Sequence, residues 1–215
     1  MNLWARFWPV TGLAFVGLFV AAILMTDDLD TNDPDADIAA FYTSNSHQTK
    51  QIVAFLMILG ACLLFVWFLA MLRMRLVQAE GGGGRWAALA FGSGLVATAL
   101  WIVADALFSA PAFAADDTDK FHLDANTFRI FDGAGYAAWF GGTTIALGTV
   151  TATAIVALKT GLLPRWLAWL SFPVAVTMLV SFFFIPFLIM CGWIIVVALT
   201  LMVRTKAPAA ATAPA

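Results

Sequence analysis

Charged residues are scarce in this chain, and their scarcity excludes a water-soluble domain. Of the 215 residues, 11% are charged and 62% are hydrophobic, whereas the surface of a soluble domain needs roughly a quarter charged residues. The few charges are also unevenly distributed, since long charge-free runs alternate with short segments that hold almost all the Asp, Lys and Arg. This pattern is typical of a chain that crosses a lipid bilayer several times.

Histidine and cysteine are also rare, which limits the chemistry that the chain can perform. The two histidines, His47 and His122, fall in hydrophilic segments, so the apolar segments offer no histidine ligand to a haem. The apolar segments also hold no lysine for a Schiff base, and the chain has no H-E-x-x-H motif. The two cysteines, Cys62 and Cys191, are expected at different depths, as core residues rather than as a disulfide. We therefore expect no enzymatic activity, no cofactor and no metal site.

The apolar runs predict an all-α polytopic membrane bundle with six spans. A hydrocarbon core of about 30 Å takes roughly 20 helical residues. The charge-free run 166–203 is too long for one crossing, and it is divided near residues 181–186, where proline can begin a new helix. The expected spans lie at residues 7–25, 52–72, 86–108, 133–158, 164–180 and 186–203. They form one domain, residues 1–206, and the low-complexity tail 207–215 is expected to be disordered.

The first apolar run also has features of a secretory signal, with a short basic start and small residues at Val20 and Ala22. Residues 23–25 continue the apolar run past that point, so a retained first helix is the preferred interpretation.

The distribution of basic residues predicts that both termini are cytoplasmic. With Met1 inside, the inner segments carry eight basic residues: Arg6, Arg73, Arg75, Arg85, Lys159, Arg165, Arg204 and Lys206. The outer segments carry three, namely Lys50, Lys120 and Arg129. Cytoplasmic loops are the ones enriched in Lys and Arg. Merging the last two spans would move Arg204 and Lys206 outside, so the charge count favours six spans.

The two outer loops are acidic, and each predicts a short amphipathic helix on the outer membrane face. In the first loop, residues 26–51, Asp33 is suited to cap a helix that begins at Pro34 and presents Ile38, Phe41 and Tyr42 on one side. In the second loop, residues 109–131, Asp124 is expected to cap a short helix that leads to Ile130.

Small residues recur at four-residue spacing in the third and fourth predicted spans. They include Gly94 in the third span, and Ala134, Ala138 and Gly142 in the fourth. Small residues at this spacing allow two helix backbones to approach closely in lipid. We expect the third and fourth spans to pack tightly together.

Asp105 and Asp132 are the candidate functional residues. Asp105 follows Thr98 by seven residues, so it shares the inward face of the third span, and Asp132 stands at the matching depth beside Tyr136. A carboxylate in a membrane span is costly and is by default a functional candidate. Two such groups at one depth could bind a proton or a cation. The alternative is a structural ion pair, in which Arg129 reaches Asp105 or Asp132 and joins the two spans.

Several motifs resemble a family of uncharacterised actinobacterial integral membrane proteins, grouped as a domain of unknown function. They are the acidic first outer loop that leads to I-A-A-F-Y at residues 38–42, the S-A-P-A-F-A stretch at 109–114, and T-G-L-L-P-R-W-L-A-W-L at 160–170. The resemblance extends to about Arg204. It implies six spans in a bacterial plasma membrane and provides no activity, cofactor or catalytic residue.

Two functions remain compatible with the sequence. The first is a non-enzymatic scaffold or accessory protein, which would use its outer loops or aromatic spans to bind a membrane-protein partner or a second copy of itself. The second is a small proton- or cation-coupled transporter that uses Asp105 and Asp132. The surrounding lipid is an obligatory partner of either, and we expect no nucleic-acid partner.

The charge count generates a direct test of the layout. A tag fused after Ala215 is expected to be unreachable from the medium of intact cells and reachable after the membrane is permeabilised. Labelling with a membrane-impermeant reagent measures this, and labelling of intact cells would contradict the six-span arrangement.

Overall fold

The computed structural model describes residues 8–27, 29–118 and 122–204, and all regular secondary structure within them is helical. The all-α class expected from the sequence is therefore confirmed. Arg6, Lys120 and Lys206 of the charge count, and the predicted tail 207–215, lie outside the described residues. The helices are α2 (Val10–Met25), α3 (Asp35–Thr43), α4 (Asn45–Glu80), α5 (Arg85–Asp117), α6 (Ala125–Thr160), α7 (Arg165–Thr177), the 3₁₀ helix η1 (Met178–Val180) and α8 (Ile185–Arg204).

The apolar helices have two lengths. By length and composition, α4, α5, α6 and α8 can each cross a membrane, while α2 and the combined α7–η1 segment are apolar but shorter. With 36 residues each, α4 and α6 are about 54 Å long, whereas the 16 residues of α2 extend only about 24 Å. The bundle therefore joins helices that exceed a hydrocarbon core of about 30 Å with helices that are shorter than it.

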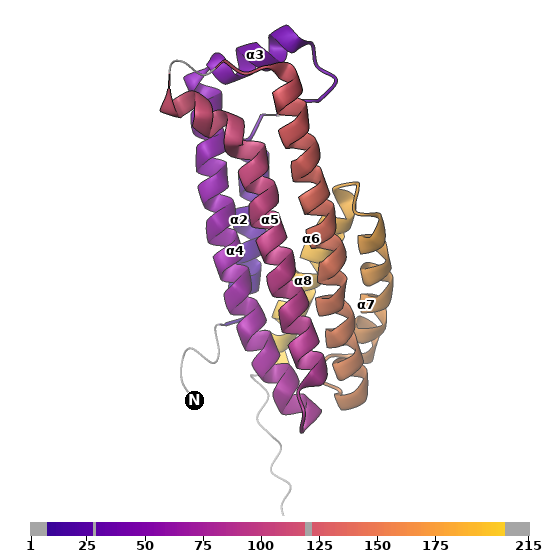
Figure 1. Ribbon diagram of the computed structural model, residues 1–215. Coiled ribbons are helices and arrows are strands. Elements are labelled where there is room, and N and C mark those ends of the chain that lie inside the picture. The colour runs from indigo at the N-terminus through magenta and orange to yellow at the C-terminus, as the bar shows by residue number, and fades with distance from the viewer. Residues whose placement is uncertain (1–7, 28, 119–121, 205–215) are drawn as a thin grey trace, which may run out of the picture.

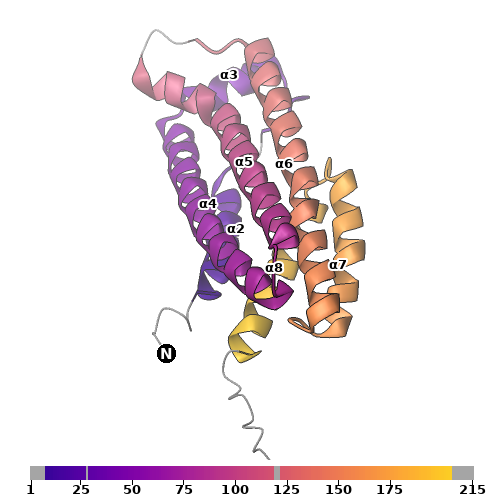
Figure 2. The same cartoon turned by 60° about the horizontal axis from the view of Figure 1, so that its bottom comes forward.

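The helices pack side by side around a common interior. In both views α4, α5 and α6 lie next to one another, with α7 beside α6 and with α2 and α8 behind them (Figures 1 and 2). Because α2 contacts both α4 and α8, the first and last helices close the bundle. The turns α4–α5 and α6–α7 lie at one end of the bundle, and α3 lies at the other (Figure 1).

Aromatic side chains fill the centre of the bundle. Phe15 of α2 stacks on Phe65 of α4 with ring centroids 4.6 Å apart. Phe19 and Trp101 both contact Phe187 of α8, at centroid distances of 4.8 and 5.5 Å. These rings are fully or almost fully buried, and aromatic pairs at such distances add about 0.5–1.5 kcal/mol each beyond the burial of their area. They connect α2, α4, α5 and α8 in one core.

The contact between α5 and α6 is the most extensive in the bundle. A Cβ atom added at Gly94 would lie 3.1 Å from Oγ1 of Thr149 on α6, and one added at Gly142 would lie 2.9 Å from Cδ1 of Trp101 on α5. Both glycines therefore occupy positions where helices approach closely. Hydroxyl groups also join the two helices, since Oγ1 of Thr149 donates to the carbonyl oxygen of Ala90 over 2.8 Å.

Two of the four residues expected at this contact lie away from its centre. Ala134 is exposed and Ala138 is half-buried. The buried stripe of α6 instead passes through Gly135, Gly142 and Ala146. The four-residue spacing used in the sequence analysis drifts off one helix face, because a helix has 3.6 residues per turn and a stripe must alternate steps of three and four.

The end of the bundle that carries α3 is more helical than expected. The predicted loop at 109–131 is short, because α5 continues through Pro111 to Asp117 and α6 already begins at Ala125. Asp124 caps α6 as predicted, since its carboxylate accepts the backbone N–H groups of Asn126 and Thr127. The helix that it caps is not a separate short element but the full α6.

Helix α3 packs on protein rather than on the outer membrane face. Ile38 is completely buried, and Phe41 and Tyr42 are at most 9% exposed. Together with Ala112, Ala125 and Phe128, they form a second small core. We call α3 and the ends of α5 and α6 that contact it the cap.

The packing at Gly142 can be tested against its neighbour in the chain. We expect Gly142→Ala to lower the free energy of unfolding by about 1–3 kcal/mol, since the added methyl group overpacks against Trp101. The matched control is Gly141→Ala, whose Cβ would meet only Leu100 at an ordinary 3.7 Å. The control should leave stability unchanged or raise it by up to about 1 kcal/mol, because alanine favours helix over glycine. Denaturant titrations in detergent micelles measure both, and equal effects would contradict the close α5–α6 contact.

Candidate functional site: a cavity beneath the cap

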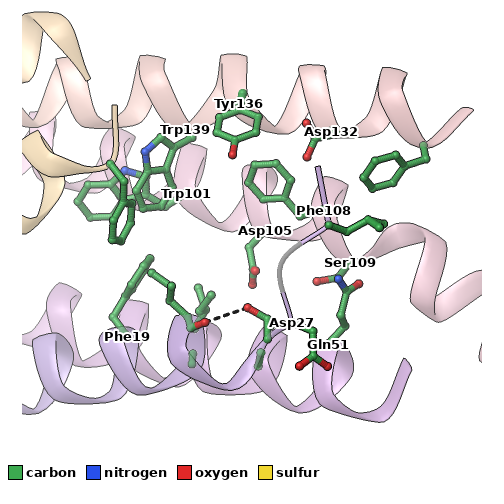
Figure 3. Close-up of a pocket in the computed structure, with 18 of the residues that line it drawn as sticks. Phe19, Asp27, Gln51, Trp101, Asp105, Phe108, Ser109, Asp132, Tyr136 and Trp139 are labelled. Atoms are coloured by element: carbon green, nitrogen blue, oxygen red, sulfur yellow. Dashed lines mark hydrogen bonds between the residues drawn. The ribbon is translucent and has the colours of Figure 1, made fainter. Parts of the chain in front are cut away.

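A cavity of about 720 Å³ lies between the helices beneath the cap. It forms where the long helices α4, α5 and α6 continue past the ends of α2 and α8 that lie nearest to the cap. Its walls come from α2, α4, α5 and α6, from the segment that follows α2, from Tyr42 of α3 and from the turn that joins η1 to α8 (Figure 3). The lining residues include no Lys, Arg or His among those that the structure describes. A cavity of this volume is within the range that holds small organic ligands.

Aromatic rings line the inner part of the cavity. Phe19, Trp101 and Trp139 belong to its lining, and the last two rings have centroids 6.3 Å apart. Phe184, from the turn before α8, stacks on Trp139 at 5.8 Å. Its neighbours Phe182 and Phe183 also line the cavity while being about 70% exposed. An apolar molecule in the cavity would therefore meet aromatic faces on several sides.

Asp105 and Asp132 both line the cavity, from α5 and α6 (Figure 3). The structure thus brings together the two carboxyl groups that the sequence analysis paired. One carboxylate oxygen of Asp105, Oδ2, is buried and accepts no hydrogen bond from the described residues. Buried polar atoms in proteins almost always have a partner, so such an exception needs an explanation.

The helix contacts explain why these groups lie where they do. Asp105 is one turn beyond Trp101, so it is on the α5 face that points into the bundle. Phe108 packs across Gly135, where an added Cβ would be 2.6 Å from its ring, and its ring is 5.3 Å from that of Tyr136. Tyr136, also a predicted site residue, lines the cavity although its side chain is more than half exposed.

Arg129 does not belong to this site, and the expected ion pair with Asp105 or Asp132 is wrong. Its guanidinium group bonds to the first outer loop instead: Nε donates to the carbonyl oxygen of Thr31 over 2.9 Å, and Nη2 contacts Asp35 Oδ1 at 2.8 Å. Arg129 therefore holds the loop before α3 against the start of α6. No salt bridge within the described ranges involves Asp105 or Asp132.

A separate group of charges lies at the rim of the cavity. Lys50 Nζ is 2.8 Å from Asp27 Oδ2, and His47 Nε2 is 3.5 Å from the same atom. The hydrogen bond from Lys50 is the main reason why the pKa of Asp27 is lowered from 3.8. Asp27 is thus balanced by its own cation, in contrast to the two carboxyl groups inside.

Uncharged polar groups complete the lining on the side of the cap. Tyr42 is 4% exposed, and burial raises the pKa of its hydroxyl to about 12. Gln51 is near enough to oppose this pKa shift, yet no hydrogen bond of good geometry forms, and both Tyr42 Oη and Gln51 Oε1 are buried without a partner in the described structure. The backbone at Tyr42 is fixed by Gln48, whose side-chain amide donates to the Tyr42 carbonyl oxygen over 2.6 Å. The cavity therefore contains polar atoms with unused bonding capacity.

Sequence reasoning found three of the polar residues of the cavity, Asp105, Asp132 and Tyr136, and missed the rest. Gln51 and Tyr42 fell in a segment assigned to an outer loop, and Trp101 and Trp139 are indistinguishable in the sequence from other apolar residues of a span. A signal was available at Gln51, because it is a polar residue in the turn just before an apolar run. The volume itself leaves no trace in the sequence, since it depends on how far each helix extends.

The ion pair at the rim gives a prediction with a definite pH dependence. Lys50→Met should raise the pKa of Asp27 towards 3.8, because the main cause of its lowering is removed. A lowered carboxyl pKa stabilises the folded state above the unfolded pKa, and this contribution is lost as the pH falls through the folded pKa. The stability difference between wild type and Lys50→Met should therefore shrink in acid below pH 4 or so.

Carbon-detected NMR of the Asp27 carboxyl measures its pKa, and denaturant titrations at several pH values measure stability. Lys159→Met, at the opposite end of the bundle, is the matched control and should leave Asp27 unchanged. An unchanged pKa in Lys50→Met would exclude the ion pair.

Comparison with known proteins adds no relative to this description. No protein-family model matches the chain, and neither a curated protein nor a solved structure is significantly similar to it. The resemblance to actinobacterial membrane proteins stays a prediction based on the motifs quoted above.

Proposed function

We propose that the protein is a small proton- or cation-coupled carrier of a bacterial plasma membrane, with six spans and both termini in the cytoplasm. The observation that carries the proposal is the cavity beneath the cap, into which Asp105 and Asp132 face without a basic partner.

Six spans are supported by the partners of the two shorter helices. Helix α2 packs on α4 and α8, and α7 packs on α6 and α8, so both belong to the same bundle as the four long apolar helices. Their 16-residue lengths correspond to about 24 Å, which a bilayer can match by local thinning. If α2 and α7 lay outside the membrane, the helices packed against them would lie outside it as well. The apolar surfaces of α4, α6 and α8 would then be exposed to water.

The orientation is supported by the positions of the basic residues and by the groups that they contact. Arg204 Nη1 donates to the carbonyl oxygens of Gly161 and Leu162, which ties the end of α8 to the α6–α7 turn. At the same end, Lys159 lies over the ring of Trp86 at 5.6 Å. The basic residues that the charge count assigns to the cytoplasm and that the structure describes thus gather at one end of the bundle, as expected from the positive-inside rule. The acidic cap occupies the other end.

A carrier is supported by the state of the two carboxyl groups. An ionised carboxylate in a poorly solvated site needs a compensating positive charge. Neither group obtains one from the described side chains, because Lys50 and Arg129 are engaged with Asp27 and Asp35. A bound proton or cation would provide that charge, and its uptake and release would then be coupled to the conformation of the cavity.

The scaffold function, which ranked first on the sequence, rested on the lack of a polar pathway. The cavity supplies the outer part of such a pathway, and we therefore rank the carrier first. We retain the expectation from the sequence that the protein is not an enzyme.

Proteoliposomes test the carrier directly. With purified protein, an imposed proton, Na⁺ or K⁺ gradient is expected to decay faster than in protein-free vesicles. Asp105→Asn should reduce the decay to the protein-free rate, because the neutral amide cannot exchange a proton or balance a cation. Internal pH-sensitive and cation-sensitive dyes follow the fluxes.

Asp37→Asn is the matched control, since Asp37 is exposed on α3 and does not line the cavity. It should transport like the wild type. No flux under any of the three gradients would leave the scaffold as the better explanation, and flux that survives both Asp105→Asn and Asp132→Asn would remove the carboxyl groups from the mechanism.

A further inference from the structure

The charged groups that line the cavity determine whether it favours a positively or a negatively charged ligand. Three carboxyl groups belong to its lining, from Asp27, Asp105 and Asp132, and among the described residues only Asp27 has a cationic partner. A cleft lined by charge of one sign and bounded by apolar walls concentrates ions of the opposite sign. The cavity therefore favours a cation and disfavours an anion.

The volume and the arrangement of ligands argue against a bare metal ion. A site for Ca²⁺ takes six to eight oxygen ligands at about 2.3–2.6 Å. Within the described ranges, no three His, Cys, Asp or Glu side chains come together in a way that could hold a metal ion. The space of about 720 Å³ is also far larger than an ion and its ligands require.

The walls select a ligand with an apolar body. Aromatic side chains from α2, α5, α6 and the turn before α8 line the same cavity, among them Phe19, Trp101, Trp139 and Phe184. Aromatic faces attract organic cations through their π electrons, with Trp the strongest partner, and bury apolar groups as well. Carboxyl groups next to aromatic faces are thus suited to a molecule that is both positively charged and hydrophobic.

We propose that the cavity binds a hydrophobic organic cation, such as a quaternary ammonium or phosphonium ion that carries aromatic or alkyl groups. The cationic centre lies near Asp105 and Asp132, and the apolar groups lie against Trp139 and Phe184, whose rings are partly exposed (Figure 3). The buried hydroxyl of Tyr42 and the amide oxygen of Gln51, which lack partners, are available on the side of the cap. This inference names the substrate class of the proposed carrier and rests on that function for its physiological meaning.

Three probes separate the contributions of charge and shape. Tetraphenylphosphonium has both the positive charge and the aromatic body, tetraphenylborate has the same shape with the opposite charge, and tetramethylammonium has the charge without the aromatic groups. Calorimetric titration of the full chain in phosphatidylcholine nanodiscs, corrected with empty nanodiscs, measures their affinities. We expect tetraphenylphosphonium to bind at least roughly tenfold more tightly than either of the others, since each lacks one of the two interactions.

Variants then assign the binding to the cavity. Asp105→Asn should weaken tetraphenylphosphonium binding by about tenfold or more, which corresponds to the loss of one contact with a charged group. Asp132→Asn is a second, independent variant, and Asp37→Asn on the exposed side of α3 is the control that should bind as the wild type does. Equal binding of the phosphonium and borate ions, or phosphonium binding unchanged in both cavity variants, would overturn the proposal.

The outcomes also separate this inference from the carrier function. Binding of tetraphenylphosphonium that depends on Asp105, in a protein that transports no ions in proteoliposomes, would support the site and refute the carrier. Flux that depends on Asp105 in a protein that does not bind tetraphenylphosphonium would support the carrier and refute this substrate class.

Discussion

The structure depends on one constraint, that helices of two lengths share a single bundle. Three helices of 33–36 residues continue outward beyond neighbours of 16–20 residues. Above the short helices, the long ones have lost part of their packing partners, and the space between them has to be filled or covered. The protein covers it with α3, whose apolar side packs on the ends of α5 and α6. The cavity is the part that remains unfilled.

Two different interactions keep this space from collapsing. The close contact of α5 and α6, made possible by glycines at Gly94, Gly135 and Gly142, fixes one wall. Arg129 fixes the side of the cavity that the cap covers, because its guanidinium group bonds to the backbone of Thr31 and to the side chain of Asp35.

The electrostatics of the cavity follow from the same arrangement. Lys50 is engaged at the rim with Asp27, and Arg129 is engaged in the cap with Asp35. Asp105 and Asp132 lie on helix faces that point inward and are left with aromatic neighbours. A carboxyl group in such surroundings is balanced only by something that enters the cavity. This is why the carrier and its cationic substrate form one connected proposal.

The sequence by itself determined the all-helical class, the apolar segments and the inward side of Asp105, because segment length and helical periodicity are local properties. It also identified Asp124 as a helix cap, since capping is decided within one turn. Only the tertiary structure decided that Arg129 pairs with Asp35, that Ala134 faces outward while Gly135 is buried, and that α3 covers protein rather than lipid. These outcomes join residues up to about a hundred positions apart, and they depend on the relative lengths and rotations of helices, which local patterns do not specify.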